Sequence, residues 1–446
     1  MFIIYDLIFF FISVFYLPVY LLRRKFHRGF LSRLGILPGD LKLDRPIWIH
    51  AVSVGEAMAV RGLLRELKKE FKQKDFVIST VTATGNKIAR GMAEDKDLVT
   101  YLPLDFSFVV NRVINKIKPG LFIIAETEIW PNLISCLYKQ NIPIALVNGR
   151  ISDSSFRGYL SIKFLLRPVL NKITVFCVQT ECCALRLERL GVLKDKIHIT
   201  GNMKFDVEDY AECSYSSSGP SASRSDTAFM SHSTRDTDLR KKLGLGFQGK
   251  LWAAGSTHPG EEEIILHTHK QLIADFQDLK LLIAPRHPER ASDIENIILK
   301  FGFKPCRISQ LDEQTNRRTG EQEVFILDTI GQLMPHYAVA DIVFVGGSLV
   351  AKGGHNILEP VSLDKPVLFG PHMFNFRDIA ELFFSNQGAI LVHNQRELTG
   401  KIKFLLNNPF AREAMVKRAR QLLLQNQGAT QKNLEYIRGL IRARGR

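Results

Sequence analysis

The sequence predicts an α/β protein built from two parallel-sheet, Rossmann-like domains in tandem. Short apolar segments alternate with helical segments from residue 46 to residue 205, and the same alternation restarts at residue 251. Between the two series, residues 214–238 are rich in Ser, Thr, Arg and Gly and almost free of apolar residues, as in a flexible linker or surface insertion. The 446 residues suffice for two domains with full hydrophobic cores.

The strands are predicted from short apolar runs bounded by polar or glycine-containing turns. In the first domain they are residues 47–52, 76–80, 121–125, 144–148 and 174–179, with a further strand ending at Ile199. In the second domain they are residues 251–254, 281–284, 324–327, 342–345 and 366–368. Residues 57–71 predict the first helix, because Leu63, Leu64 and Leu67 recur at helical spacing among basic residues.

Residues 1–22 are almost wholly apolar and aromatic, interrupted by Asp6 and Pro18, and a basic segment follows at once. This order predicts a membrane anchor, because a cleaved signal peptide carries its positive charges before its apolar segment. The basic flank places the rest of the chain in the cytoplasm. A shallow, monotopic insertion is the alternative, since the segment is only just long enough to span a bilayer.

The formal net charge of +15 indicates an anionic partner, which could be nucleic acid, an anionic membrane surface or a phosphorylated substrate. The basic residues cluster behind the apolar N-terminal segment and near the C-terminus, without a basic stripe interleaved with aromatic residues. This distribution favours a membrane and a phosphorylated lipid over nucleic acid. The six cysteines lack paired spacing, so we expect neither a zinc site nor a disulfide scaffold, and no metal.

Polar residues that directly follow strands are the candidate site residues of the first domain, because open α/β sheets bind ligands at the carboxyl ends of their strands. Glu56 follows the first strand, either as a catalytic base or as a carboxylate that only compensates a helix dipole. Glu126 and Glu128 follow residues 121–125, and we expect one to cap the next helix and the other to be functional. Lys204 is either a cation for a phosphate or carboxylate or a solvated surface lysine.

The second domain carries basic and glycine-rich turns after its strands. Pro285, Arg286 and His287 place a guanidinium and an imidazole at a strand end, which suits a phosphate monoester. The glycines of residues 346–349 and 353–360 would let backbone amides approach a phosphate, or would only make tight turns. In the last of these segments Glu359 could accept hydrogen bonds from a ribose, and residues 255–258 add a further turn after the first strand.

Taken together, these segments resemble one family, the 3-deoxy-D-manno-octulosonic acid (Kdo) transferases of lipopolysaccharide biosynthesis. The motifs are SVGE at 53–56, ETEIWPN at 126–132, GNMKFD at 201–206, STHPGEE at 256–262, PRHPER at 285–290, GGSL at 346–349 and GGHNILEP at 353–360. The resemblance implies the GT-B glycosyltransferase fold. It assigns residues 1–22 to the anchor, 23–206 to an acceptor-binding domain, 207–245 to the linker, 246–425 to a CMP-Kdo-binding domain and 426–446 to a helix that crosses back to the first domain.

The resemblance further implies an inverting transfer of Kdo from CMP-Kdo to the lipid A precursor, lipid IVA, at the cell inner membrane and without a cofactor. Glu56 would be the general base, ionised because the nearby helix start lowers its pKa, while Glu126 and Lys204 would stabilise the transition state. CMP would be held by Pro285, Arg286, Ile330, Gly331, Gln332, Asn356, Ile357, Leu358 and Glu359. Gln332 departs from the family, which commonly has an acidic residue at this position.

A GT-B transferase that uses a different nucleotide-sugar donor is the alternative. It would keep the fold and the glycine-rich turns. The SVGE segment and the sequence Pro285-Arg286-His287 argue against it.

Overall fold

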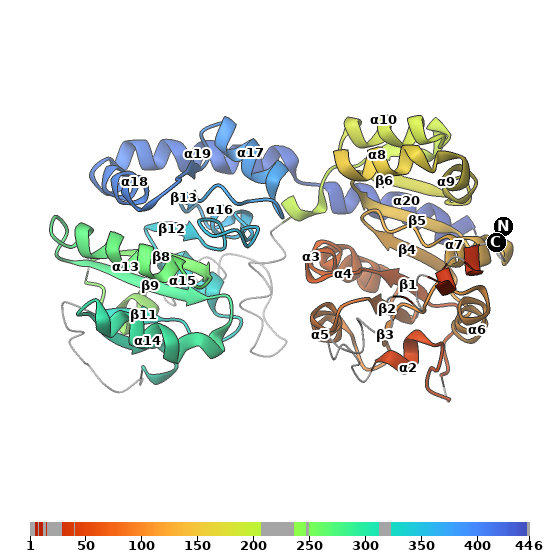
Figure 1. Cartoon of the computed structure of the whole chain (residues 1–446), viewed down its shortest axis with the longest axis horizontal. Helices are drawn as coiled ribbons and strands as arrows, with labels where there is room; N and C mark the ends of the chain where they lie inside the picture. Colours follow the sequence, from red (N-terminus) through yellow and green to blue (C-terminus); the bar gives the residue numbers. More distant parts are fainter. Residues whose placement is uncertain are drawn as a thin grey trace. The chain divides into compact units, whose positions relative to one another are not determined.

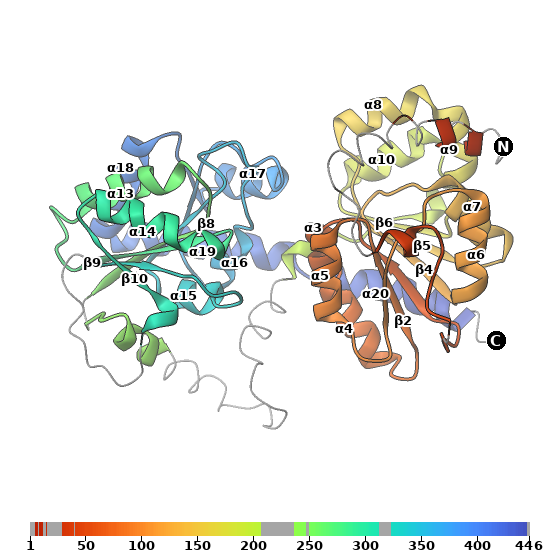
Figure 2. The same ribbon diagram turned by 60° about the horizontal axis from the view of Figure 1, so that its bottom comes forward.

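The computed structural model describes residues 5–7, 9–11, 15, 29–39, 41–206, 236–246, 249–311 and 323–443. The chain divides into two compact units, Met1–Asp206 with Asn426–Arg446, and Val207–Gln425. Each unit is a parallel sheet with helices on both faces (Figures 1 and 2), which confirms the predicted pair of Rossmann-like domains. Most of the expected linker, residues 207–235, lies outside the described residues.

Most of the expected membrane anchor, residues 1–22, also lies outside the described residues. Where the chain is described, no helix is both long enough and apolar enough to cross a bilayer. Asp6 is hydrogen-bonded to the first unit, where its carboxylate accepts from the Ser107 amide at 3.1 Å and from Asn132 Nδ2 at 2.6 Å. The Phe9 ring packs edge-on against Phe106. These N-terminal residues therefore lie against the first unit.

The first unit contains a seven-stranded sheet of order β3-β2-β1-β4-β5-β6-β7, and every adjacent pair is parallel. Its strands are β1 (Ile47–His50), β2 (Phe76–Thr80), β3 (Leu98–Tyr101), β4 (Leu121–Ala125), β5 (Ile144–Gly149), β6 (Val175–Val178) and β7 (Ile197–Ile199). The strand order reverses between β1 and β4, so the loops after these two strands leave toward opposite faces of the sheet. This switch point is where such sheets bind ligands.

The first unit's helices are α2 (Phe30–Arg33), α3 (Val54–Ala59), α4 (Arg61–Glu70), α5 (Ala83–Met92), α6 (Ser107–Ile117), α7 (Pro131–Lys139), α8 (Asp153–Ser161), α9 (Lys163–Leu170), α10 (Glu181–Leu190) and α20 (Ala429–Ala443), with the 3-10 turns η1 (Lys194–Lys196) and η2 (Met203–Phe205). The single helix predicted over residues 57–71 was wrong. It begins at Val54, because Ser53 caps it, and it is interrupted at Val60. The Asp206 carboxylate accepts from the amides of Gly428 and Thr430, which fixes the start of α20.

The second unit also contains a seven-stranded parallel sheet, of order β10-β11-β9-β8-β12-β13-β14. Its strands are β8 (Lys250–Thr257), β9 (Leu279–Pro285), β10 (Lys304–Arg307), β11 (Glu323–Ile326), β12 (Ile342–Val345), β13 (Val367–Phe369) and β14 (Ile390–Leu391). The sequence pattern did not predict β3, β10 and β14. These strands lie at or next to the sheet edges, where short or half-exposed segments lack a continuous apolar run.

The second unit's helices cover both faces of this sheet and connect its strands. They are α13 (Glu261–Leu272), α14 (Ala291–Lys300), α15 (Leu333–Val339), α16 (Leu358–Ser362), α17 (Arg377–Ser385), α18 (Gln395–Asn407) and α19 (Pro409–Asn426), with η3 (Pro288–Arg290) and η4 (Ile308–Gln310). The reversal of strand order falls between β8 and β12. The loops after β8, β9 and β12 are thus the expected ligand-binding loops of this unit.

We predict that Gly255→Ala destabilises the second unit. Gly255 lies in β8, and a Cβ atom there would stand 1.7 Å from the Tyr337 hydroxyl, which is held in the core. Such overpacking costs about 1–3 kcal/mol, so the thermal unfolding midpoint of this unit should fall. Gly400→Ala is the matched control, because Gly400 lies in α18 with no atom near its Cβ position. An unchanged midpoint for Gly255→Ala would contradict the close approach of Tyr337.

Candidate functional site

Glu56 lies in the first turn of α3, six residues after β1 ends at His50, on the carboxyl side of the sheet. The Val52 amide donates to Glu56 Oε2 at 2.7 Å, and the Ser53 hydroxyl donates to Oε1 at 3.0 Å. Ser53 in turn accepts from the Glu56 amide, so the two residues form a variant of the capping box. Each carboxylate oxygen retains a further acceptor position, so this capping role leaves room for a substrate hydroxyl.

The environment of Glu56 raises the pKa of its carboxyl group to about 7. Burial is the main cause, and the negative charges of Glu126 and Glu128 add to it, while the hydrogen bonds from Val52 and Ser53 oppose it. The expectation that the helix start lowers the pKa of Glu56 was wrong, because desolvation outweighs the helix amides. A carboxylate with a pKa near neutrality is well matched to general base catalysis.

Glu126 and Lys204 form an ion pair at the same edge of the first sheet. Lys204 Nζ lies 3.0 Å from Glu126 Oε1, and the side chains are only 17% and 23% exposed. Glu126 directly follows β4 and has a left-handed φ of 57°, with its amide bonded to the Val147 carbonyl. Lys204 lies in η2, which contacts α3. The alternative of a solvated surface lysine was wrong, because Lys204 is largely buried against a carboxylate.

The expectation that Glu126 or Glu128 caps α7 was also wrong. The Asp105 carboxylate accepts from the Asn132 amide at 3.1 Å and from the Leu133 amide at 2.9 Å, so it occupies the start of α7 from the neighbouring loop. α7 has no side-chain cap from its own N-terminal residues, and the charges of Glu126 and Glu128 instead act on Glu56, whose pKa they raise. Burial raises the pKa of Glu128 as well, with Glu126 as a second cause.

In the second unit, Arg286 lies directly after β9, whose last residue is Pro285. The Arg286 amide donates to the Thr257 carbonyl at 3.0 Å, which joins the loops after β8 and β9. Its guanidinium is exposed and forms no ion pair with the part of the chain that the structure describes. Arg286 is close enough to Glu359 to lower the pKa of that carboxyl group. The structure therefore brings two of the predicted CMP-binding residues together.

Residues 356–359 form a compact turn into α16. Asn356 Oδ1 accepts from the Leu358 amide at 3.1 Å, and its Nδ2 donates to Glu359 Oε1 at 3.4 Å. Burial raises the pKa of Glu359 to about 7, and Asn356 and Arg286 oppose the rise. The side chains of Ile357 and Leu358 are buried, so any ligand contact from these two residues would come from their backbone.

The remaining predicted CMP-binding residues lie after β11. Ile330 is 80% exposed, and Gly331 has a φ of 86°, which a residue with a side chain rarely adopts. Gln332 precedes α15 without a side-chain capping bond, and its carbonyl lies 2.7 Å from His336 Nδ1. Since β11 is next to β9, this turn lies at the same sheet edge as Arg286.

Sequence reasoning missed the role of Glu261, the first residue of α13. Its buried carboxylate accepts from four backbone amides, those of His258 at 3.0 Å, Gly347 at 2.6 Å, Ser348 at 3.0 Å and Leu349 at 2.9 Å. It thereby fixes the turn after β12 against the loop after β8. The STHPGEE segment was the available signal, but only the fold shows which amides the carboxylate meets.

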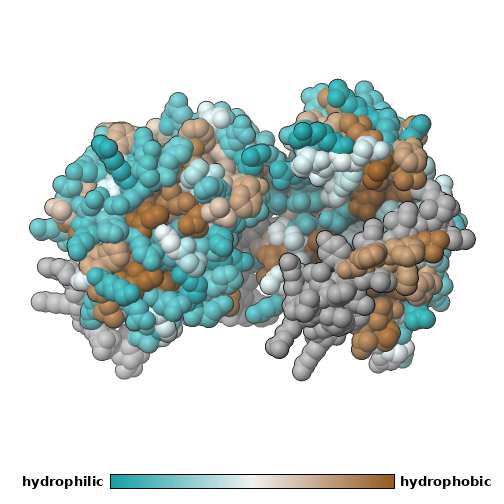
Figure 3. Space-filling view, viewed as in Figure 1, coloured by the Kyte–Doolittle hydropathy of each residue, from teal (hydrophilic) through white to brown (hydrophobic). Residues whose placement is uncertain are grey.

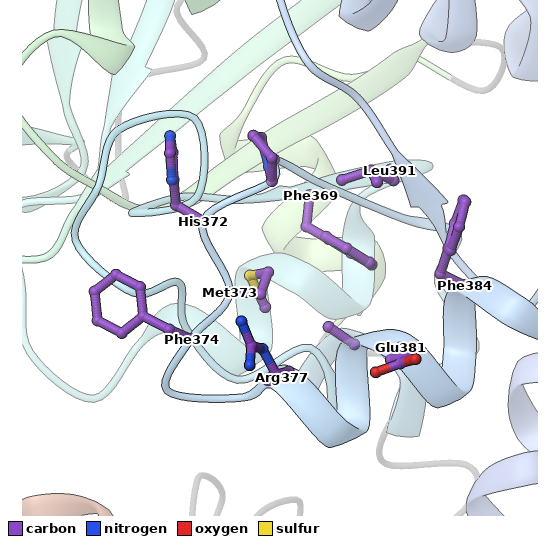
Figure 4. Close-up of a pocket in the computed structure, with 11 residues that line it drawn as sticks. Phe369, His372, Met373, Phe374, Arg377, Glu381, Phe384 and Leu391 are labelled. Carbon is purple, nitrogen blue, oxygen red and sulfur yellow. The ribbon is translucent and has the colours of Figure 1, made fainter. Parts of the chain in front are cut away.

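Figure 4 shows a pocket of about 380 Å³ beside this turn, lined by Phe369, Gly370, Pro371, His372, Met373, Phe374, Arg377, Ala380, Glu381, Phe384 and Leu391. The loop that forms one wall adjoins the glycines of the predicted donor site. A Cβ atom at Gly353 would collide with Asn375 and Phe374, and one at Gly354 with Met373. These two glycines are therefore needed for close packing, as well as for their left-handed φ angles.

The two parallel α/β units have the fold of GT-B glycosyltransferases. Among solved structures, the chain is similar to UDP-GlcNAc 2-epimerase from Neisseria meningitidis, with a TM-score of 0.57 and 14% identity over 88% of this chain and 99% of that one. A glycosyltransferase from Rickettsia africae gives a TM-score of 0.54 and 14% identity, over 89% of this chain and 99% of that one. These likenesses define the fold.

Residues 28–207 match the model of the family described as 3-Deoxy-D-manno-octulosonic-acid transferase (kdotransferase). The chain is 36% identical to the 3-deoxy-D-manno-octulosonic acid transferase of Haemophilus influenzae, over 88% of this chain and 86% of that protein. It is 30% identical to the Chlamydophila psittaci transferase, over 98% and 96%. The protein belongs to the Kdo transferase family of glycosyltransferases, which confirms the resemblance seen in the sequence.

Proposed function

We propose that this protein transfers Kdo from CMP-Kdo to the lipid A precursor, lipid IVA, with inversion at the anomeric carbon and with Glu56 as the general base. Membership of the Kdo transferase family supports Kdo as the transferred sugar. The observation that carries the mechanism is the half-buried Glu56 carboxylate, which follows β1 at the switch point of the first sheet and has a pKa near 7.

In this mechanism an acceptor hydroxyl attacks the anomeric carbon of Kdo as Glu56 takes the hydroxyl proton. The new bond joins the acceptor oxygen to the anomeric carbon, and the bond from that carbon to the phosphate oxygen breaks, so CMP leaves with the bonding pair. One displacement inverts the anomeric centre. Lys204, held by Glu126 at 3.0 Å, lies in η2, which contacts the helix that carries Glu56. Its positive charge stabilises the negative charge that develops in the transition state.

The second unit would bind the donor. Arg286 offers an exposed guanidinium, which forms strong charge-assisted hydrogen bonds to a phosphate. The turn at Gly331 and the segment from Asn356 to Glu359 supply backbone amides, and the Glu359 carboxyl would accept from the ribose. The leaving group is a phosphate monoester, so cations and amides are sufficient to stabilise it.

We further propose that the protein acts at the cytoplasmic face of the inner membrane, held there by its N-terminal segment. Support comes from large apolar side chains exposed on the first unit, which are Leu7, Phe10, Phe11, Phe15, Leu31, Ile36, Phe108, Leu160, Ile162, Phe164 and Leu165. Helix α8 buries none of its residues. Figure 3 shows hydrophobic areas beside hydrophilic ones on the visible face of this unit. Exposed apolar groups on a chain with a net charge of +15 suit the interface of an anionic membrane.

The donor and acceptor can be tested by measuring CMP release. The full chain would receive CMP-Kdo with or without a tetraacylated lipid A precursor in detergent micelles, and a nucleoside-diphosphate sugar would replace CMP-Kdo in a parallel reaction. We expect rapid CMP release that requires the lipid. Release of nucleotide only from the diphosphate donor would instead support a transferase for another nucleotide sugar.

We predict that kcat/KM for transfer rises with pH along an acidic limb with an apparent pKa of about 7, because Glu56 must be deprotonated to accept a proton. The raised pKa means that the folded protein loses this proton only as the pH passes through about 7. Glu126→Gln removes a charge that raises the pKa of Glu56. The acidic limb of this variant's pH profile should therefore move to lower pH, even though the variant transfers Kdo more slowly. A limb that stays in place would contradict the coupling of these two carboxyl groups.

A further inference from the structure

His258 and His355 form a stacked pair at the carboxyl edge of the second sheet. Their Nε2 atoms are 3.0 Å apart, and their rings are nearly parallel, with an interplanar angle of 3° and centroids 5.3 Å apart. His258 follows β8, and His355 precedes α16, so two separate loops deliver the two rings. Both rings lie over Gly347, where a Cβ atom would come within 3.0 Å of His355 and 3.1 Å of His258. The turn after β12 thus requires glycine to admit the pair.

A hydrogen bond between two Nε2 atoms needs one N–H and one lone pair, so at most one of the two rings is protonated at both nitrogens. Neither Nδ1 atom has a hydrogen-bond partner among the residues that the structure describes. The pair therefore holds unused hydrogen-bonding capacity next to the loop that contains Arg286.

The surroundings of the pair are cationic. The pKa of His355 is lowered to about 4 and that of His258 is lowered as well, mainly by burial, and the neighbouring positive charges lower both further. Those charges come from Arg286, His287, Arg290 and Lys352 on the loops after β9 and β12.

The carboxylates that face this region already have partners. Glu262 is bonded to Arg290, the oxygens of Glu261 accept from backbone amides, and Glu359 is bonded to Asn356. By contrast, Arg286 and Lys352 form no ion pair with a described residue. Two neutral imidazoles beside unpaired cations are thus arranged for an anion that none of the described side chains supplies.

We propose that His258 and His355 together bind the phosphate of the nucleotide donor, and that the pair takes up one proton from solvent when the phosphate binds. This proposal rests on the proposed function, because it concerns the same donor site. Binding of the phosphate breaks the hydrogen bond between the rings. One ring keeps its N–H, the other gains a proton, and both then donate to phosphate oxygens. The negative charge of the phosphate offsets the cations that otherwise disfavour a charged imidazole.

Proton uptake is the test, because a merely structural pair would not show it. CMP would be titrated into the full chain by calorimetry, slightly above neutral pH, in two buffers that differ in ionisation enthalpy. We expect about one proton to be taken up per CMP, beyond the protonation of CMP itself, and none with cytidine. His258→Gln and His355→Gln should each abolish this uptake and weaken CMP binding about tenfold, the loss of one hydrogen bond to a charged group.

The glutamine variants keep a neutral hydrogen-bonding group at each position, so they should melt near the wild-type temperature. His393→Gln, at an exposed site beside Glu397 at the start of α18, is the matched control and should retain the uptake. CMP binding without proton uptake in the wild type would overturn the inference and leave the proposed function standing. Uptake driven by free Kdo and not by CMP would assign the pair to the sugar carboxylate and overturn the phosphate assignment. Failure of CMP to bind the wild type at all would reject the proposed function together with the inference.

Discussion

Replacing Glu56 by glutamine should lower kcat for Kdo transfer by about 10²–10⁴-fold, the usual contribution of a general base, and should leave CMP affinity unchanged. Glutamine keeps the size of the side chain and its ability to accept from the Val52 amide, but it cannot take the acceptor proton. The measurement is kcat from initial rates with saturating lipid acceptor, together with calorimetric titration of CMP. Turnover near the wild-type rate would reject Glu56 as the base.

A control variant distinguishes the role of Glu56 as a base from its role in the capping interaction of α3. Ser53→Ala removes the hydroxyl that caps α3 and donates to Glu56 at 3.0 Å, but it leaves the carboxylate in place. It should destabilise the first unit by about 1 kcal/mol and retain most of the transfer activity. If both variants lose transfer to the same extent, the capping interaction rather than the base would explain the Glu56 result.

Arg286→Ala should weaken CMP binding by about 10–100-fold, because a charge-assisted hydrogen bond contributes roughly 1.5–3 kcal/mol. The guanidinium lies after β9 and forms no ion pair among the described residues, so its removal breaks no salt bridge, and Glu359 keeps its hydrogen bond from Asn356. The folded unit should therefore keep its thermal midpoint. CMP affinity by calorimetry, at two salt concentrations, is the measurement.

Lys403→Ala is the matched control for Arg286→Ala. It removes one positive charge from the same unit, but Lys403 Nζ is 2.6 Å from Asp275 at an exposed site on α18. It should leave CMP affinity unchanged. Equal weakening by both variants would indicate a general effect of net charge, and unchanged affinity for Arg286→Ala would count against the donor site.

The sequence predicted the central strands well because they are buried on both faces and read as continuous apolar runs. β2, β4 and β12 begin and end where the pattern placed them. Three edge strands, β3, β10 and β14, were not predicted. β3 is only half-buried over its first two residues, β10 is polar, and β14 has only two residues. The break between α3 and α4 at Val60 also escaped, since the apolar spacing continues through it.

Candidate site residues were predicted only where a polar or charged side chain lies in the segment that follows a strand. That rule brought out Glu56, Glu126 and Arg286, all of which the structure places at the carboxyl edges of the sheets. The roles of Asp105 and Glu261 were not predicted, because each carboxylate accepts from backbone amides of another loop. The raised pKa of Glu56 also depends on burial and on carboxylates of a neighbouring strand, which a local helix-start argument does not include.

The most direct test of the central claim is the mass of the lipid product. The full chain would be incubated with CMP-Kdo, generated in place, and a tetraacylated lipid A precursor, alongside Glu56→Gln, and the lipids would be resolved by mass spectrometry. The proposed function predicts lipid that is heavier by whole Kdo units with the wild type, and unmodified lipid with the variant. Unmodified lipid from a wild-type enzyme that still binds CMP would contradict lipid IVA as the acceptor, and equal modification by Glu56→Gln would contradict the base.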